Sequence, residues 1–408
     1  MKRVVITGMA ALTGLGNDWQ TFSENLKQKK SAIQVMDDWA VYKELNTRLA
    51  APINDFKTPA HFSRKQTRSM GRVALLATAA TETALQQAQL LGDPLLNSGN
   101  VGVSYGSSTG SPDAVKDFAG MLVSHDMSSI TATTYLRLMS HTCAVNIGIF
   151  FGLKGRVFTT SSACTSGSQG IGQAFEAIKF GKQTVMLAGG AEELCASEAA
   201  VFDTLYATSQ FNDQPDKSPR PFDKDRDGLV IGEGAATLVL EELEHAQARG
   251  ATIYAEIVGY ASNSDGGHVT QPSHDTMATA MQLALDDAEL PSSAIGYINA
   301  HGTATERGDI AESTATYNVF GSNTAISSLK GNIGHTLGAC GAIESWASIN
   351  MLNDGNFYPT LNLLEPDERC AKIDYIMGQP RQSDCEFIMS NNFAFGGINT
   401  SLIFKRWS

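Results

Sequence analysis

The stretch Thr-Thr-Ser-Ser-Ala-Cys-Thr-Ser-Gly-Ser, Thr159 to Ser168, joins a predicted strand to a predicted helix. The preceding segment, 151–160, ends in a strand-like run, and the segment 169–180 has the apolar spacing of a helix. Cys164 is therefore expected at a strand-to-helix turn, among small residues that let a substrate come close. Free N–H groups and the positive end of the helix dipole favour thiolate, so we expect Cys164 to be a nucleophile.

Short β-branched runs alternate with longer helical patterns along the rest of the chain, which predicts an α/β fold with buried strands. Strands are expected at Arg3–Thr7, Val101–Tyr105, Thr184–Leu187, Ala235–Glu241, Ile253–Tyr260, Tyr297–Ala300, Ala325–Ser327 and Phe387–Ser390. Helices are expected at Arg64–Leu91, Ser168–Phe180, Asp275–Ala288, Asp309–Phe320 and Ala339–Leu352.

Two segments, 157–190 and 325–355, both begin as strand, small-residue turn and apolar helix, which indicates an internal duplication. The first turn carries Cys164 and the second carries His335. Two related halves would bring both turns to one pocket at the strand ends. Chance similarity of two strand–turn–helix units is the alternative. We place the boundary near Gly250, giving an N-terminal half of residues 1–250 and a C-terminal half of residues 251–408.

Composition narrows the classes of function. The 408 residues carry a net charge of −12, which argues against nucleic acid as the main partner. No apolar run is long enough for a membrane span, and Thr7, Gly8 and Gly14 interrupt the apolar N-terminal run, which disfavours a signal peptide. The six cysteines are scattered without a CxxC pair, so we expect free thiols and a cytoplasmic location.

Three further clusters carry chemistry: Asn299–Glu312 with His301, Lys330–Glu344 with His335, and Asn391–Asn399 with a Gly-Gly turn whose N–H groups could bind an oxyanion. Either histidine taken alone is more often structural. A cysteine with two histidines could form a hydrolytic, metal or acyl-transfer site. Metal is disfavoured because no pair has ligand spacing, and a Cys-His hydrolase needs only one histidine.

These motifs, in this order, resemble a β-ketoacyl-acyl carrier protein synthase, the elongating condensing enzyme of thiolase-like fold. The likeness runs from Val4-Val5-Ile6-Thr7-Gly8 to Phe395-Gly396-Gly397-Ile398-Asn399 and includes Ser218-Pro-Arg-Pro-Phe-Asp223 and Pro359-Thr360-Leu361-Asn362. It implies two duplicated halves in an α-β-α-β-α layering. It also implies decarboxylative condensation of an acyl-Cys thioester with a malonyl-carrier thioester, extending the chain by two carbons.

The resemblance also implies the roles of individual residues. Cys164 would hold the acyl group, and His301 and His335 would bind the malonyl thioester carbonyl. Phe395 would gate the site, and its N–H and that of Cys164 would form the oxyanion hole. The remaining catalytic and supporting residues would be Lys330, which lies near Glu312 and orders the site, and Asp309. A salt-bridged structural lysine is the alternative for Lys330.

Binding residues follow from the same likeness. Thr303 and Thr305 would line the phosphopantetheine tunnel, and Thr109, Phe202 and Phe393 would contact substrate. A structural Na⁺ or K⁺ would match Asn299, Glu344, Ser390 and Asn391. No cofactor is expected to be required, because phosphopantetheine arrives on the carrier protein.

The chain departs from the usual synthase pattern at Ser107–Gly110 and at Ser140-His141. Thr109, Thr142 and Cys143 would make the acyl tunnel slightly polar, which suggests a polyene or aryl-polyene chain. Neutral drift in a housekeeping synthase is the alternative.

An acidic carrier protein needs a basic docking patch. Arg64, Arg68 and Arg72 are spaced by four with Lys65 adjacent, which predicts one helix face. A solvated helix face is the alternative, and Phe211 replaces one arginine expected near such a site. A homodimer is expected, and a heterodimer with a chain-length factor stays open.

Related enzymes on this fold are less compatible with the sequence. A degradative thiolase would need a second cysteine at the C-terminal Gly-Gly turn, and Cys385 lies upstream of it. A chain-length factor would lack the nucleophile, and the initiating synthases use a Cys-His-Asn set. The catalytic subunit of a specialised type II polyketide or aryl-polyene system remains the alternative function.

Overall fold

The computed structural model describes all 408 residues, which fold around one mixed sheet of eleven strands. The first five main strands come from residues 4–242 and lie in the order β5-β4-β6-β8-β1. They are β1 (Val4–Thr13), β4 (Val101–Gly106), β5 (Val157–Thr160), β6 (Val185–Glu192) and β8 (Gly234–Glu242).

The next five main strands repeat this arrangement in the order β11-β10-β15-β16-β9. They are β9 (Ala255–Ser264), β10 (Ile295–Asn299), β11 (Ala325–Ser327), β15 (Phe387–Ala394) and β16 (Ile398–Arg406), with β13 (Asp374–Tyr375) beyond β11. Numbered in chain order, the second, third and fourth strands of each half are parallel. The fifth strand pairs antiparallel with the fourth, and the first pairs antiparallel with the fifth. The expected duplication is therefore confirmed, and β1 pairs with β9 where the halves meet.

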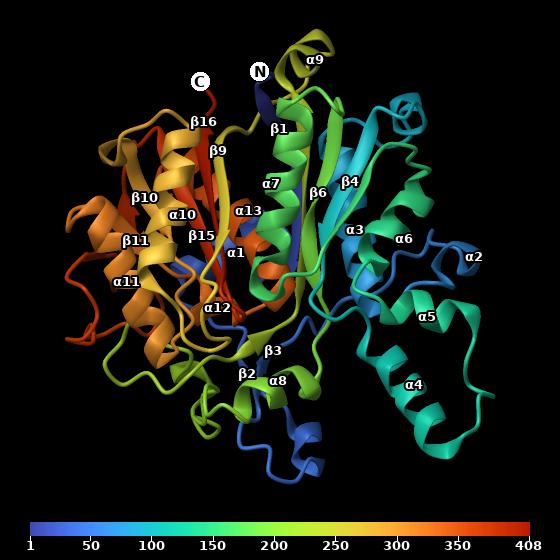
Figure 1. Ribbon diagram of the computed structural model, residues 1–408, viewed down its shortest axis with the longest axis horizontal. Coiled ribbons are helices and arrows are strands. Elements are labelled where there is room, and N and C mark those ends of the chain that lie inside the picture. The colour runs from blue at the N-terminus through green and yellow to red at the C-terminus, as the bar shows by residue number, and fades with distance from the viewer.

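Helices form three layers around the two half-sheets, which confirms the α-β-α-β-α arrangement (Figure 1). The central layer is α7 (Ser166–Lys179) and α13 (Cys340–Asp354). α13 is buried on nearly every side because it packs between both half-sheets. The outer layers are α3 (Arg72–Gln87) on the N-terminal half-sheet, and α10 (His274–Asp287) with α11 (Glu306–Phe320) on the other.

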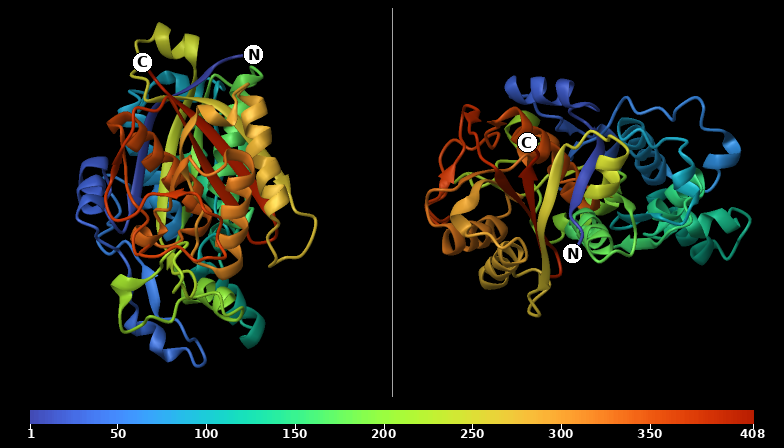
Figure 2. Two further views of the ribbon diagram at one scale, coloured as in Figure 1. Left: turned by 90° about the vertical axis from the view of Figure 1, so that its left-hand side faces the viewer. Right: turned by 90° about the horizontal axis from the view of Figure 1, so that it is seen from above.

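The remaining elements surround these layers. The other helices are α1 (Trp19–Lys27), α2 (Arg64–Thr67), α4 (Pro112–Ser124), α5 (Ala132–Leu138), α6 (Thr142–Phe151), α8 (Ala196–Asp203), α9 (Leu243–Ala248) and α12 (Lys330–Ile333). The short strands are β2 (Gln34–Val35), β3 (Leu49–Ala51), β7 (Ile231–Gly232), β12 (Asn356–Phe357) and β14 (Arg381–Gln382). The two chain ends lie on the same side of the molecule (Figure 2), and no helix combines the length and apolarity needed to cross a bilayer.

Several expected elements differ in extent. The single helix expected over Arg64–Leu91 is wrong: α2 ends at Thr67 and α3 begins at Arg72. Gly71 stands at the N-cap of α3 in an extended conformation, where a Cβ would lie 2.4 Å from Ser111, so the chain must turn there. β16 was not expected, although it is central in the C-terminal half. The exact boundary at residue 250 stays a prediction.

Candidate active site

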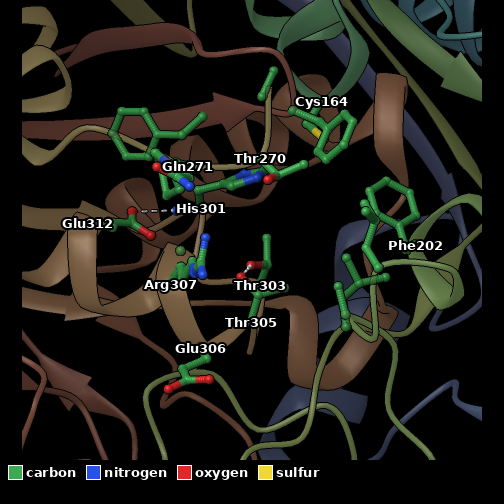
Figure 3. Close-up of a pocket in the computed structure, with 18 of the residues that line it drawn as sticks. Cys164, Phe202, Thr270, Gln271, His301, Thr303, Thr305, Glu306, Arg307 and Glu312 are labelled. Atoms are coloured by element: carbon green, nitrogen blue, oxygen red, sulfur yellow. Dashed lines mark hydrogen bonds between the residues drawn. The ribbon is translucent and has the colours of Figure 1, made fainter. Parts of the chain in front are cut away.

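The turns at the carboxyl ends of the parallel strands open into a pocket of about 630 Å³. Cys164, His301 and His335 line it together with Phe393 and Phe395, so the structure brings the two halves' predicted catalytic residues together. In Figure 3, Cys164 and Glu306 lie at opposite ends of the view, with His301 between them. The pocket therefore extends from the reactive thiol to the first turn of α11.

Cys164 lies in a 3₁₀ turn, Ala163–Thr165, that leads directly into α7, as the sequence predicts. Only 3 % of its surface is exposed. Burial raises the pKa of the Cys164 thiol to about 11, although the N–H of Phe395, the charge of Lys330 and the N–H of Cys164 itself oppose the rise. The N–H groups at the turn favour thiolate, as expected, but desolvation has the larger effect in the resting site.

His335 stands between α12 and α13, with Nε2 3.0 Å from the Cys164 Sγ. The backbone N–H of Leu337 donates to His335 Nδ1 at 3.2 Å. Because Nδ1 accepts, the neutral ring carries its proton on Nε2. Burial, with the nearby Lys330, holds the pKa of His335 well below its usual range, so the ring is neutral at pH 7 and directs an N–H into the pocket.

His301 follows β10 and lies against His335, with ring centroids 5.0 Å apart. Two donors face its Nδ1, Lys330 Nζ at 3.3 Å and Asn392 Nδ2 at 3.4 Å. Burial and then Lys330 and His335 lower the pKa of His301 well below its usual range. His301 is thus a second neutral imidazole with its proton on Nε2.

Lys330 is fully buried and has an ion-pair partner that the sequence did not predict. Its ammonium forms an ion pair with Glu344 and donates to the His301 carbonyl at 2.6 Å. Burial is the largest single effect and lowers the pKa of Lys330, but the charges of Glu344, Cys340 and Glu312 and the hydrogen bond to Glu344 together outweigh it and raise the pKa. Glu312 lies near Lys330, as expected, and its charge also raises the Lys330 pKa, but Glu344, one helical turn into α13, reaches the ammonium directly.

Glu312 and Asp309 instead hold the turn that carries His301. Glu312 accepts from the N–H groups of His301 and Gly302, both at 2.7 Å. Asp309 accepts from the N–H groups of Thr303 at 3.0 Å and Ala304 at 3.1 Å. Burial raises the pKa of Glu312 to about 8 and that of Asp309 to about 6. Both therefore act on the backbone of the site rather than on its reacting atoms.

Aromatic rings close the inner wall of the pocket. The Phe395 and Phe202 rings meet edge to face with centroids 5.9 Å apart, and Phe393 lies beside His301 at 6.3 Å. Phe395 begins the turn that contains Gly396 and Gly397, both with positive φ, and the backbone N–H of Phe395 points at the Cys164 sulfur. The residues therefore combine a nucleophile, two N–H donors on imidazoles and backbone donors at the sulfur.

The comparisons with known proteins agree with this geometry. The family model for the beta-ketoacyl synthase N-terminal domain matches residues 1–246, and the model for the C-terminal domain matches residues 254–364. This chain belongs to the beta-ketoacyl synthase family. It is a condensing acyltransferase of that family.

Individual relatives cover the whole chain. The 3-oxoacyl-[acyl-carrier-protein] synthase 2 of Vibrio harveyi is 37 % identical and covers 99 % of each chain. A crystal structure of a beta-ketoacyl synthase from Burkholderia phymatum STM815 is 58 % identical over 100 % of both chains, with a TM-score of 0.99. A ketosynthase in complex with its chain length factor from Xenorhabdus doucetiae is 25 % identical, covers 100 % of this chain and 98 % of its own, and has a TM-score of 0.82.

The other predicted binding residues of this synthase divide into two groups. Thr303 and Thr305 line the pocket with their hydroxyls 2.9 Å apart. Thr109 does not line it: its side chain is exposed and donates to Glu198 at 3.1 Å. Sequence reasoning missed Arg307, an exposed residue of the pocket lining in the first turn of α11. The signal was present as Glu306-Arg307 directly after the threonine-rich turn.

The predicted docking residues lie on two different elements of the synthase. Arg64, Lys65 and Arg68 are exposed on α2 and its C-cap. Arg72 begins α3 and forms an ion pair with Glu233, whose carboxylate is buried, so its inclusion in one basic helix face is wrong. The break at Gly71 explains the difference.

The predicted monovalent-cation residues are all buried. The Oδ1 atoms of Asn299 and Asn391 have no hydrogen-bond partner, and Asn299 donates to Ser390 at 3.3 Å. Unpaired buried acceptors fit a monovalent cation, but Glu344 is already bound to Lys330 and to Asn392.

A transition metal fits the catalytic residues poorly. Ligand atoms of Cys164, His301 and His335 lie within 4.8 Å of one another. Their wide separation along the sequence therefore does not by itself argue against a metal site. Both Nδ1 atoms, however, accept from N–H donors, which keeps the protons on Nε2 and removes the lone pairs that a metal would need.

Proposed function

We propose that this protein is an elongating β-ketoacyl-acyl carrier protein synthase that condenses an acyl group on Cys164 with a malonyl group on a carrier protein. The observation that carries the proposal is the convergence of Cys164 Sγ with two neutral imidazoles in one pocket. A hydrolase would need a histidine that accepts the thiol proton, whereas both imidazoles here direct an N–H into the pocket.

Acyl loading is the first step. The Cys164 sulfur attacks the thioester carbon of the acyl carrier, and the carrier sulfur leaves as a thiol that has taken up the proton of Cys164. The oxygen of the tetrahedral intermediate would accept from the N–H groups of Cys164 and Phe395, which already point at the sulfur. His335 Nε2–H, 3.0 Å from Sγ, stabilises the developing thiolate.

Decarboxylation is the second step. The malonyl thioester carbonyl would accept hydrogen bonds from His301 and His335 through Nε2–H. The bond between the carboxylate carbon and the α-carbon breaks, CO₂ leaves, and its electron pair forms the enolate. Neutral imidazoles suit this step because they stabilise the enolate oxygen without protonating the α-carbon.

Condensation completes the cycle. The enolate carbon attacks the acyl-Cys164 carbonyl, the carbon–sulfur bond to Cys164 breaks, and a β-ketoacyl chain two carbons longer remains on the carrier. The released Cys164 thiolate takes up a proton from water. Lys330 acts through His301 in this account, because it contacts the His301 ring and carbonyl.

The carrier's phosphopantetheine arm would enter along Thr303 and Thr305, and the cation Arg307 stands at the same wall of the pocket (Figure 3). The acidic carrier would dock on Arg64, Lys65 and Arg68. Separation of the Phe202 and Phe395 rings would admit the acyl chain, with Phe395 as the gate.

The partner subunit would join the sheet at β5, the edge strand of the N-terminal half. Val157 on β5 of this chain is 48 % exposed, and Ile149 on α6 is 66 % exposed. We favour a second copy of this chain, and a chain-length factor is the alternative. The mass of the purified complex decides between them, because only a heterodimer requires a second gene product.

We also propose that the protein works in the cytoplasm, which its six free cysteines support. We further propose a Na⁺ or K⁺ at Asn299 and Asn391, which their unpaired Oδ1 atoms support. The acyl chain remains a proposal as well: we favour a polyene or aryl-polyene chain over a saturated one, although Thr109, on which this choice partly rests, does not line the pocket. A clear preference for saturated acyl carriers in turnover would contradict that choice.

Intact-mass analysis with a panel of acyl-carrier proteins tests the function. Wild-type protein should gain one acyl group, and malonyl carrier should then discharge it as an extended product. A matched Cys164→Ala variant should gain nothing. No gain by wild type, or a gain that survives in the variant, would overturn the proposal.

A further inference from the structure

Glu192, the last residue of β6, is a fully buried carboxylate that the reaction scheme does not use. Ser107 Oγ donates to its Oε1 at 3.0 Å. The N–H groups of Ser108 and Gly338 donate to its Oε2 at 2.9 Å and 2.8 Å. All three partners donate, which fits the ionised carboxylate, although burial raises the pKa of Glu192.

The two backbone donors belong to opposite sides of the active site. Ser108 follows β4, and its carbonyl accepts at 3.3 Å from the hydroxyl of Ser161, three residues before Cys164. Gly338 follows Leu337, whose N–H donates to His335 Nδ1. Glu192 therefore connects the turn of the nucleophile to the turn that fixes the His335 tautomer.

The halves approach closely at this point. A Cβ on Gly338 would lie 2.6 Å from Glu192 Oε2 and 2.8 Å from the Ser108 nitrogen. A Cβ on Gly190 would lie 2.3 Å from the Gly338 carbonyl oxygen. Only hydrogen-sized side chains fit, so backbone meets backbone and the Glu192 carboxylate supplies the polar link.

We propose that Glu192 is a positioning residue that holds the Leu337–Gly338 turn against the Ser107–Ser108 turn and so aligns His335 Nε2–H with Cys164 Sγ. This inference rests on the proposed function and explains how the two sides of the active site are aligned. Loss of the link would let the turn move, and a displacement of about 1 Å in an active site can cost on the order of a hundredfold in rate.

Two substitutions of Glu192 test this, and the first, Glu192→Gln, changes the shape little. Both backbone N–H groups donate to the same oxygen, Oε2, so the glutamine carbonyl can keep both while its NH₂ group donates to Ser107 Oγ, and this variant removes the charge but keeps the link. Glu192→Asp is the second variant: it keeps the charge but is one methylene too short to span both turns. The matched control is Glu193→Gln, since Glu193 is also buried but accepts from the N–H of Val73 on α3.

Two readouts separate positioning from stability. The first is kcat and KM for malonyl carrier. The second is the pair of ¹⁵N ring shifts of His335, which report the tautomer without any substrate. We expect Glu192→Asp to lower kcat by about tenfold or more with KM within about threefold and to mix the His335 tautomers, and we expect Glu192→Gln to stay close to wild type in both readouts. Glu193→Gln should keep the wild-type tautomer and kcat within about threefold.

The outcomes are decisive. Wild-type ring shifts and kcat in Glu192→Asp would overturn the inference, and so would equal losses in Glu192→Asp and Glu193→Gln. If wild-type protein releases no CO₂ from malonyl carrier, the proposed function fails instead, while the ring shifts still decide the role of Glu192.

Discussion

The two halves of the molecule have the same strand order, but the loops at equivalent strand ends carry different chemistry. After the third strand, the N-terminal half has Cys164 and the C-terminal half has Lys330 and His335. After the second strand, the corresponding loops carry the hydroxyls of Ser107 and Ser108 on one side and His301 on the other. The duplication gave both halves the same strand scaffold, and different loops on that scaffold carry the different chemical roles.

Because of this division, a substitution in one half should impair the half-reaction that this half carries out. The N-terminal half holds the acyl group and the C-terminal half prepares the nucleophilic carbon.

Removal of the nucleophile should have the largest effect. Cys164→Ala should lower condensation by at least about 10⁴-fold, because the covalent intermediate is lost. The assay is formation of β-ketoacyl carrier from acyl and malonyl carriers. Cys340→Ala is a useful control, since Cys340 is a buried neighbour that donates to the Cys164 carbonyl but has no part in the reaction scheme. Similar losses in the two variants would contradict the assignment.

The resting thiol should titrate unusually late. Because burial raises the pKa of Cys164 to about 11, its alkylation by iodoacetamide should rise about tenfold per pH unit from pH 7 towards pH 10. Quantitative mass spectrometry of the labelled peptide measures the rate. A plateau near neutral pH would instead support a thiolate stabilised by the helix terminus.

Removal of the Lys330 ammonium should destabilise the C-terminal half. Lys330→Met leaves the Glu344 carboxylate buried without its counter-charge, which should cost about 3–5 kcal/mol in the free energy of unfolding. Lys405→Met, at a partly exposed pair with Glu386, should cost less than about 1 kcal/mol. Equal losses in the free energy of unfolding, measured by urea denaturation, would contradict the larger contribution expected of the buried pair.

The stability of the His301 turn should depend on pH through Glu312. Its folded-state pKa is about 8, above the ordinary value of 4.5, so the folded protein binds the proton more tightly than the unfolded chain. The stability contribution of this group is full below pH 4.5 and declines as pH rises towards 8. Glu312→Gln should therefore flatten the decline in the free energy of unfolding over that range, and an unchanged slope would contradict the assignment.

Charge reversal at the carrier surface should have the smallest effect. Arg68→Glu should raise KM for carrier substrates by about three- to tenfold at low salt and leave kcat nearly unchanged, with the difference shrinking as salt screens the patch. Arg72→Glu is no equivalent test, because Arg72 is bound to Glu233. An unchanged KM would argue against docking on α2.

The sequence predicted the alternation of elements, the duplication and the residues that meet in the pocket because these depend on local patterns and distinctive motifs. It did not predict the pKa of Cys164, since burial arises from the packing of both halves around the turn. It also missed the Lys330–Glu344 pair and the link through Glu192. Glu192 and Gly338 lie 146 residues apart, so no local spacing encodes their contact, and the Lys330–Glu344 pair, 14 residues apart, spans the turn between α12 and α13.

Release of CO₂ from malonyl carrier, without any acyl group, tests the division of labour most directly. Cys164→Ala should retain CO₂ release within about tenfold of wild type, because its two imidazole donors remain. His301→Ala and His335→Ala should each lose about a hundredfold or more, because one oxyanion donor is typically worth that factor. Loss of CO₂ release in the Cys164 variant together with its retention in both histidine variants would contradict the account.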